Sequence, residues 1–298
     1  LVDVVTKGVW TNTSPVTAYR GAGRPEAIYT LERIIDLAAE EIGLDRIELR
    51  RRNVATRDPV SGAPHSQSAM MEAYDMGAAR FGWHRRIAQP GMRREGEWLI
   101  GMGCASGTFP FMRMPGTSVR ITIDASGDAH VASAAHEMGM GTATVQRQHA
   151  ADRLGLPLDR VTVTIGDSSL PFASFAGGSS QTASLAAAIS AASGKLVAEL
   201  LRLAGNDTPL AGLKPAEAEF ADGGLRSVED PSRSESFASI LRRSGREELS
   251  VVGESGAPLE IMKYAMHSTS ANFCELRVSD VTGEIRVDRL VGAFDCGH

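Results

Sequence analysis

Two glycine-bearing turns near the middle of the chain combine the residue types best suited to bind an anion. The first turn is Gly139-Met140-Gly141-Thr142, and the second is Gly177-Gly178-Ser179-Ser180-Gln181-Thr182. Each turn leads directly into a segment with the pattern of a helix. The first N–H groups of a helix lack partners within it and carry partial positive charge, so they can seat a phosphate. The pair therefore predicts one extended anionic ligand held at two points.

A simpler interpretation is that both turns are ordinary helix starts. Gly, Ser and Thr are preferred at such positions whatever the function, and for either turn alone this interpretation is favoured. The second turn, however, has a run of small and amide residues where a single cap residue would suffice. The two turns together therefore favour a ligand, although they do not identify it.

Arg20 is a further candidate for binding, because it precedes the turn Gly21-Ala22-Gly23. Glycines let a backbone come close to a bound group, and the arginine fork can donate to an oxyanion. An ordinary surface arginine explains the same residue equally well.

The elements that must position these residues follow from hydrophobic periodicity. Alternating residues predict β-hairpins at 117–134 and 271–293, each with a glycine turn. Helical spacing and apolar runs predict the remaining elements. The expected helices are 25–43, 45–53, 68–81, 142–154, 182–203 and 236–243, and the expected strands are 1–10, 99–105 and 161–165. The fold class is therefore α+β, a mixed α/β chain with β-hairpins and with helices packed on sheets.

Two stretches of the chain do not show this periodicity. The loop at 166–181 carries Phe172 and Phe175, which we expect to pack against the protein or a ligand. Residues 206–258 are polar and charged, and we expect them to form a peripheral insertion.

Composition excludes several classes of protein. The chain has 298 residues, 43% of them hydrophobic and 22% charged, which is the range of a globular protein. A net charge of −5 without a long basic run argues against nucleic acid as the main partner, and Arg50, Arg51 and Arg52 are expected on a solvated helix face. No continuous apolar run is long enough for a membrane span. The first residues do not resemble a signal peptide, so we expect a cytoplasmic protein, or a periplasmic one exported through a partner.

The three cysteines provide no metal site of their own. Cys104, Cys274 and Cys296 lie far apart and form no CxxC pair, so an iron–sulfur cluster or zinc site built from this chain alone is not expected. We expect all three to be small core residues.

Several segments, taken in order, resemble one family. They are Thr17-Ala18-Tyr19-Arg20-Gly21-Ala22-Gly23-Arg24-Pro25-Glu26, Glu48-Leu49-Arg50-Arg51-Arg52-Asn53, residues 136–184, Gly283-Glu284-Ile285-Arg286-Val287 and Asp295-Cys296-Gly297. Together they resemble the molybdenum-binding large subunit of the xanthine dehydrogenase, aldehyde oxidase and carbon monoxide dehydrogenase family, and most of all its bacterial aldehyde oxidoreductase branch. On this resemblance, residues 1–95 belong to a first molybdopterin-binding region and 96–298 to a second, truncated at the C-terminus.

The resemblance implies which residues bind the cofactor, a molybdopterin that in bacteria is often the cytosine dinucleotide. Arg20, Gly21 and Ala22 would lie beside the molybdenum. Arg20 would also assist catalysis, from the second layer of residues around the reacting atoms. Gly107, Thr108 and Phe109 would form a further loop at the metal pocket. The remaining candidates are Gly139, Met140, Gly141 and Thr142 on one side of the cofactor and Gly178, Ser179, Ser180, Gln181, Thr182 and Ala183 on the other. No residue of this chain is expected to ligate the metal.

The resemblance also implies the activity and the partners. The complete enzyme would hydroxylate an aldehyde or an N-heterocycle with water and pass electrons to iron–sulfur clusters and FAD on separate subunits. Two departures matter: Met140 stands where many members have Gln, and the catalytic glutamate lies beyond His298. We therefore expect an internal piece that is inactive in isolation. A non-catalytic phosphate-binding module or an assembly module remains the alternative.

Overall fold

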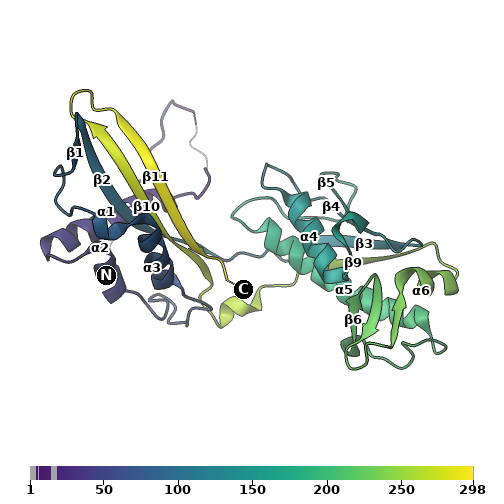
Figure 1. Ribbon diagram of the computed structural model, residues 1–298. Coiled ribbons are helices and arrows are strands. Elements are labelled where there is room, and N and C mark those ends of the chain that lie inside the picture. The colour runs from purple at the N-terminus through teal and green to yellow at the C-terminus, as the bar shows by residue number, and fades with distance from the viewer. Residues whose placement is uncertain (1–4, 6, 15–18, 298) are drawn as a thin grey trace. The chain divides into compact units, whose positions relative to one another are not determined.

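The computed structural model describes residues 5, 7–14 and 19–297 (Figure 1). The chain divides into two compact units. Unit 1 comprises Leu1–Val54, Ala69–Thr108 and Thr269–Asp295, and unit 2 comprises Ala55–Ser68, Phe109–Ser268 and Cys296–His298. The boundary predicted after residue 95 falls inside unit 1, because a long strand that starts at Trp98 belongs to the same sheet as the C-terminal hairpin.

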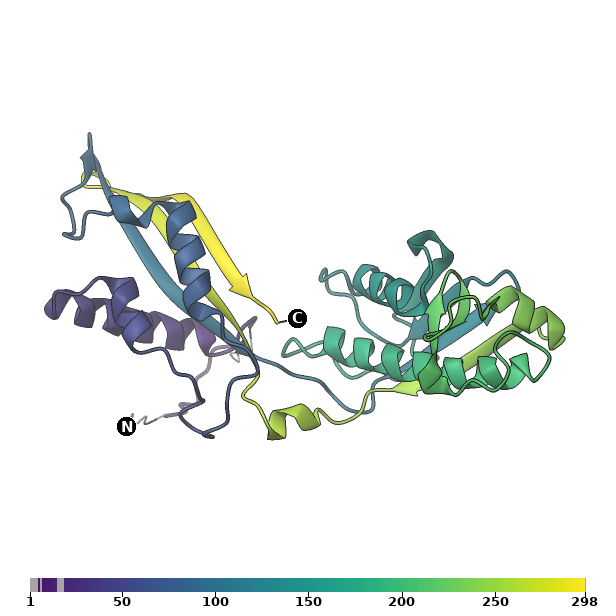
Figure 2. The ribbon, with the colours of Figure 1, turned by 60° about the horizontal axis from the view of Figure 1, so that its bottom comes forward.

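Unit 1 is built on a four-stranded sheet with the order β1-β2-β10-β11. The strands are β1 (Arg94–Glu95), β2 (Trp98–Pro110), β10 (His267–Ser279) and β11 (Ile285–Asp295). Its helices are α1 (Arg24–Glu41), α2 (Arg46–Arg52), α3 (Met70–Phe81) and the short 3-10 helix η1 (Trp83–Arg85). Helix α3 lies along the sheet (Figures 1 and 2). The predicted C-terminal hairpin is confirmed as β10 and β11.

An aromatic cluster forms the core of unit 1. The ring of Phe273 lies 5.9 Å from that of Tyr74, 5.4 Å from Phe81 and 5.8 Å from Trp83, measured between centroids. Tyr74 and Phe81 are fully buried, and aromatic pairs at such spacings stabilise a core beyond the area they bury. The cluster fixes α3 and η1 against the central strand β10.

Unit 2 contains a second four-stranded sheet, of order β5-β4-β3-β9. Its strands are β3 (Ser118–Asp124), β4 (Ala129–Ser133), β5 (Val161–Ile165) and β9 (Glu248–Glu254). Strands β3 and β4 form the predicted antiparallel hairpin, and α4 (Thr142–Leu154) with η2 (Leu158–Arg160) connects β4 to the parallel strand β5. The bounds of α4 and β5 are those predicted from the sequence.

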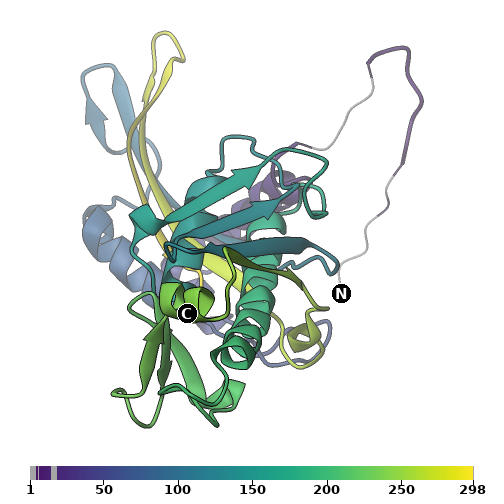
Figure 3. The same cartoon turned by 90° about the vertical axis from the view of Figure 1, so that its right-hand side faces the viewer.

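Helix α5 (Gln181–Ala204) is the central helix of unit 2 and packs on β3 and β9 (Figure 3). Its contact with β9 is close, because a Cβ built on Gly253 would lie 2.2 Å from the backbone nitrogen of Ala192. By length and composition alone α5 could cross a membrane, yet half of its apolar window is buried within the protein. This is the environment of a core helix.

The stretch 206–258 is integrated into unit 2 more than we expected. It forms a small sheet of β6 (Ala218–Ala221), β7 (Gly224–Ser227) and β8 (Ser234–Ser236), with η3 (Pro215–Glu217) before it and α6 (Phe237–Arg243) after it. Leu225 and Phe237 are fully buried in the main core, and β9 pairs with β3 along its whole length. The prediction of a peripheral insertion is therefore wrong for these apolar residues. The sequence did not reveal them, because the stretch is polar on average.

Two smaller expectations also need correction. The described residues 7–10 form no strand, and residues 1–4 and 6 lie outside the described part. Among the cysteines, only Cys104 is buried, whereas Cys274 is half-buried and Cys296 is exposed. The 3-10 turn η4 (Leu259–Met262), which precedes β10, was not predicted.

Helices α1 and α2 are held together by a buried ion network. The guanidinium of Arg50 donates to Glu32 at 2.5 Å and to Asp36 at 3.1 Å, and only 5% of its side chain is exposed. Asp36 also accepts from Arg46 at 2.6 Å. Arg50 therefore does not lie on a solvated face as predicted, whereas Arg51 and Arg52 are exposed.

The same network explains an error in the predicted face of α1. Leu31 and Ile34 share the helical spacing of a buried stripe, yet each is 57% exposed, while Glu32 is buried. Among the described residues, α1 thus turns a charged residue toward α2. Spacing alone misses this, because it assigns every apolar stripe to a core.

Replacing Arg50 with Ala should destabilise unit 1 strongly, since Glu32 and Asp36 would lose a shared cation in a mostly buried setting. We expect a loss of about 3 kcal/mol in the free energy of unfolding. The exposed ion pair of Arg52 with Glu48 gives the control, and Arg52→Ala should cost less than about 1 kcal/mol. Urea unfolding followed by circular dichroism measures both. Equal losses for the two variants would contradict a central role for the Arg50 network.

Candidate functional site

The N-terminus of α4 is closed by a carboxylate from its own chain. Oε1 of Glu137 accepts from the backbone N–H groups of Gly139 at 2.8 Å and Gly141 at 3.1 Å, and its Oε2 accepts from Thr142 at 2.6 Å. The first predicted anion seat is therefore already occupied, and the prediction that its N–H groups are bare is wrong. Glu137 precedes this cap in the sequence, but nothing in the sequence indicates that it accepts three hydrogen bonds.

These donors also set the charge state of Glu137. Desolvation raises its pKa, but the backbone N–H groups of Gly141, Thr142, Gly139 and Met140 outweigh that effect and hold the pKa below its ordinary value. The carboxylate is therefore charged at neutral pH and complements the positive end of α4.

The N-terminus of α5 differs, because no side chain caps it within the described residues. Its N-cap residue, Ser180, makes no side-chain cap hydrogen bond, and its hydroxyl donates instead to the carbonyl of Gly177 at 2.8 Å. The preceding backbone is left-handed at Gly178 (φ 64°) and at Ser179 (φ 60°). A non-glycine residue with positive φ is strained, and such strain concentrates at binding sites. The second turn therefore keeps the character of an anion seat.

The side chain of Gln181 joins the two turns. Its amide oxygen accepts from the N–H of His136 at 3.1 Å, and its Nε2 donates to the His136 carbonyl at 2.7 Å and to Oγ1 of Thr142 at 3.1 Å. Gln181 is only 3% exposed. The two predicted turns therefore lie side by side. Gln181 lies at the start of α5, as the sequence indicates, and its side chain also links the second turn to the first.

A second amide supports the same junction. Nε2 of Gln146, on α4, donates to the carbonyl of Thr182 at 3.3 Å, while its buried Oε1 has no hydrogen-bond partner among the described residues. An acceptor left open in this way has room for a donor from a water or a ligand. Gln146 was not among the predicted site residues, and an amide in the middle of a helical pattern gives no local signal.

The segment that follows β2 lies against the second turn. The N–H of Met114 donates to Oγ of Ser184 at 2.8 Å, and a Cβ on Gly178 would lie 3.1 Å from the sulfur of Met112. Unit 2 therefore brings the loop after β2 to the second turn, whereas Gly107, Thr108 and Phe109, predicted as a loop, lie in strand β2.

Apolar side chains around these turns are exposed. Met138 and Met140 are 69% and 42% exposed, and Phe172 and Phe175 are 66% and 63% exposed. The ring of Phe175 lies over Gly177, where a Cβ would be 2.5 Å from it. Of the expected packing against the protein or a ligand, this contact of Phe175 shows the first, and packing against a ligand stays a prediction.

The other predicted residues lie in unit 1. Arg20, Gly21 and Ala22 form a tight turn, exposed at Arg20, and Nη1 of Arg24 ties the segment after it to the carbonyl of Thr108 at 3.2 Å. Gly107 faces Ser270, whose Oγ would lie 2.7 Å from an added Cβ, so a larger residue there would have to displace the serine hydroxyl. Unit 1 thus brings together the two predicted segments that it contains.

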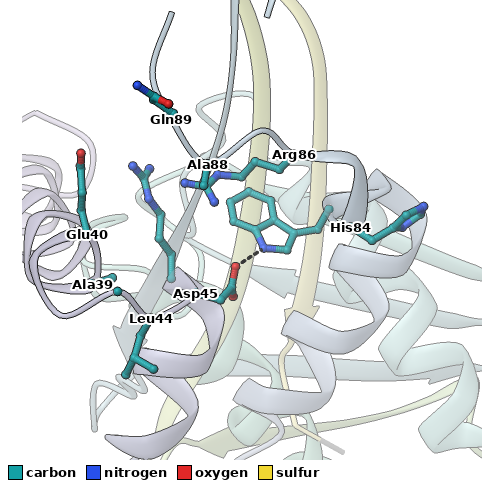
Figure 4. Close-up of a pocket in the computed structure, with 11 residues that line it drawn as sticks. Ala39, Glu40, Leu44, Asp45, His84, Arg86, Ala88 and Gln89 are labelled. Carbon is teal, nitrogen blue, oxygen red and sulfur yellow. Dashed lines mark hydrogen bonds between the residues drawn. The ribbon is translucent and has the colours of Figure 1, made fainter. Parts of the chain in front are cut away.

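A cavity of about 550 Å³ in unit 1 contains none of the predicted cofactor residues (Figure 4). It lies between the C-terminal end of α1 and η1. Its wall includes Asp45, which caps α2 through the N–H groups of Ile47 and Glu48 and also accepts from Nε1 of Trp83 at 3.0 Å. These bonds give the carboxylate a structural role.

Comparison with known proteins decides the family. A molybdopterin cofactor-binding domain model matches residues 76–298, and a second model of the same description matches residues 1–54. The chain belongs to the molybdopterin cofactor-binding domain family. The resemblance seen in the sequence is thereby confirmed.

Curated relatives of this cofactor-binding chain support the same assignment. It is 32% identical over 284 residues to the aldehyde oxidoreductase molybdenum-binding subunit PaoC of Escherichia coli K12, covering 94% of this chain and 37% of PaoC. It is 30% identical over 164 residues to the putative xanthine dehydrogenase molybdenum-binding subunit XdhA of the same strain, covering 53% of this chain and 22% of XdhA. The chain therefore spans well under half the length of these relatives.

Solved structures show the same fold. Quinoline 2-oxidoreductase from Pseudomonas putida 86 matches with a TM-score of 0.80 at 20% identity, over 96% of this chain and 39% of that one. A Cu,Mo-CO dehydrogenase matches with a TM-score of 0.74 at 19% identity, over 90% of this chain and 37% of that one. The mixed helix and sheet class predicted from the sequence is confirmed.

The family's cofactor is anionic, and the two helix starts differ in how well they fit it. The start of α5 offers backbone donors with no side-chain cap among the described residues, which suits a phosphate. The start of α4 does not, because Glu137 already takes its donors. Among the described residues, no group of three His, Cys, Asp or Glu side chains is placed to hold a metal ion.

Replacing Gln181 with Leu should loosen the junction of the two turns, because it removes three hydrogen bonds and leaves the groups around it unpaired. We expect the free energy of unfolding of unit 2 to fall by about 2 kcal/mol. Gln148, exposed on α4, provides the control, and Gln148→Leu should change stability by less than about 0.5 kcal/mol. Urea unfolding is the measurement, and an unchanged Gln181→Leu midpoint would rule out the bridging role.

The depressed pKa of Glu137 predicts a specific pH dependence. A carboxyl whose folded pKa is lowered adds stability above its unfolded pKa of about 4.3 and loses it as the pH falls through the folded value. Glu137→Gln should therefore destabilise the protein at neutral pH, and its difference from wild type should shrink in acid. Unfolding measured across this pH range tests the sign, with the exposed Glu229→Gln as control. A difference that grows in acid would refute it.

Proposed function

We propose that this chain supplies part of the molybdenum-cofactor site of a hydroxylase that oxidises an aldehyde or an N-heterocycle with water. The observation that carries the proposal is the junction of the two glycine turns through Gln181, next to a helix start without a side-chain cap, in a cofactor-binding family. When bound, the cofactor supplies the redox centre at which the substrate carbon is oxidised.

Within that site, the chain's own residues bind and position the cofactor. The backbone N–H groups of Gln181, Thr182 and Ala183 would donate to its phosphate, helped by the left-handed backbone at Gly178 and Ser179. Glu137 fixes the conformation of the turn formed by Gly139, Met140, Gly141 and Thr142. Because its carboxylate occupies the N–H groups of this turn, the turn would contact the cofactor through other atoms on its surface. This role differs from the anion seat predicted from sequence.

The residues in unit 1 have a separate role in the proposal. Arg20 would donate to an oxygen of the substrate or the cofactor and stabilise negative charge as it develops. Gly21, Ala22, Gly107 and Thr108 would let the backbone approach the bound group. Support comes from their grouping within unit 1 through Arg24.

The wider assembly is also part of the proposal. PaoC is a molybdenum-binding subunit, and a 62-residue stretch is 47% identical to a protein named the gamma subunit of the 6-hydroxypseudooxynicotine dehydrogenase complex of Paenarthrobacter nicotinovorans. By analogy we propose iron–sulfur and FAD partner subunits, a cytosine dinucleotide form of the cofactor and a cytoplasmic location. Activity would require more than residues 1–298, which cover 37% of PaoC.

Cofactor content tests the proposal directly. Gly178 has a φ of 64°, and a Cβ there would lie 3.1 Å from Met112, so Gly178→Ala should distort the turn before α5. In the intact protein we expect it to lower bound molybdenum and pterin at least about 3-fold, as the loss of one good cofactor contact would. Metal analysis and pterin fluorescence measure this.

Gly212→Ala is the matched control for this experiment. Gly212 has a φ of 76° and has no atom within 4 Å of an added Cβ, so it imposes similar backbone strain away from the turns. Its cofactor content should match wild type. If wild-type protein contains neither molybdenum nor pterin, the hydroxylase function is wrong. Equal molybdenum and pterin content in Gly178→Ala and Gly212→Ala would instead show that Gly178 is not part of the cofactor site.

A further inference from the structure

The stretch from the last turn of α3 to the first residue of β1, residues 80–94, is rich in arginine in a protein of negative net charge, and Glu95 and Glu97 follow it. Residues 80–94 contain five arginines and neither Asp nor Glu, whereas the whole chain carries a net charge of −5. Two of these arginines, Arg85 and Arg93, join Arg289 of β11 around a cavity of about 500 Å³ in unit 1. The wall is completed by Ile87, Met102 and Glu275.

One carboxylate at the cavity is shared by two of the guanidiniums. Glu275 lies opposite Arg289 in the register of β10 and β11. Its Oε2 is 3.2 Å from Nη2 of Arg289 and 3.4 Å from Nη1 of Arg93. A single carboxylate oxygen therefore faces two cations, and neither pair has the bidentate geometry that makes such bridges strong. Glu95, which does not line the cavity, lies 3.6 Å from Arg93.

The third arginine has no carboxylate partner within 4 Å among the described residues. Arg85 ends η1, and its side chain folds back over Gly82, where a Cβ would lie 2.5 Å from Nη2. Only glycine leaves room for this conformation. The cavity thus has three guanidiniums and one carboxylate in its wall, and the nearby Glu95 reduces the net excess to one positive charge.

Packing holds part of this charge in place before any ligand arrives. The guanidinium carbon of Arg289 lies 4.4 Å from the ring centroid of the fully buried Phe81. The side chains of Arg93, Arg289 and Glu275 are only 34%, 34% and 16% exposed. Such partial burial reduces solvent screening, and a stacked arginine loses little entropy when it binds.

We propose that the cavity between η1, β10 and β11 binds a phosphate-type oxyanion, with Arg85, Arg93 and Arg289 as its donors. Guanidinium forks match the oxygens of such a group, and the net positive charge of the cluster favours an anion. Glu275 is then an internal competitor that holds two of the forks while the site is empty. This site belongs to unit 1 and is distinct from the turn before α5, so it goes beyond the proposed cofactor binding.

Calorimetric titration of the intact protein with inorganic phosphate, at constant ionic strength set by chloride, tests the proposal. Arg85→Gln should weaken phosphate binding about 5-fold, the effect of one partly screened charged hydrogen bond. Glu275→Gln keeps the size of the side chain but removes the competing charge, so it should tighten binding about 10-fold. This gain is not expected from a merely structural role.

Two controls make the outcome specific. Arg80 is an exposed arginine of the same segment outside the cavity wall, and Arg80→Gln should leave phosphate affinity within about 2-fold of wild type. Arg85→Gln should also leave the content of molybdenum and pterin at the wild-type level, which separates this site from the cofactor turn. The proposal is overturned if neither wild type nor Glu275→Gln binds phosphate, or if Arg80→Gln weakens binding as much as Arg85→Gln.

Discussion

The side-chain amide of Gln181 is the interaction on which the candidate site depends. Its oxygen accepts from the N–H of His136, and its nitrogen donates to the carbonyl of His136. The same nitrogen also donates to Oγ1 of Thr142. Because Gln181 is almost completely buried, these bonds form where water does not compete with them. Helices α4 and α5 therefore start at one place, although 39 residues separate Thr142 from Gln181.

Charge distinguishes the two helix starts that Gln181 brings together. An N-terminal carboxylate and a bound phosphate meet the same need, since each supplies negative charge to unpaired N–H groups. Glu137 meets that need at α4, whereas no side chain does so at α5 among the described residues. A ligand gains most where the protein has left its own donors open. The site is thus asymmetric, with one start serving structure and the other available for binding.

Local signals in the sequence predicted the elements well, and long-range pairing limited the rest. Helix α4, strand β5 and both hairpins were predicted from spacing and glycine turns, because each depends on neighbouring residues. Strand β9 was missed because its partner β3 lies more than 100 residues earlier in the chain. The buried Arg50 was missed because its burial depends on carboxylates of another helix, which periodicity within α2 does not reveal.

The candidate site shows the same limit at the scale of single atoms. Small residues before a helix indicate that a backbone could accept an anion, but they do not say whether the chain supplies one itself. For α4 the answer depends on Glu137, five residues before Thr142, and on a side-chain conformation that aims both oxygens at the turn. For α5 it depends on Ser180 turning its hydroxyl toward Gly177 and away from the helix. Two glycine-bearing turns thus differ in whether a side chain of the protein already occupies their donors, because the folded backbone decides which acceptor side chain reaches them.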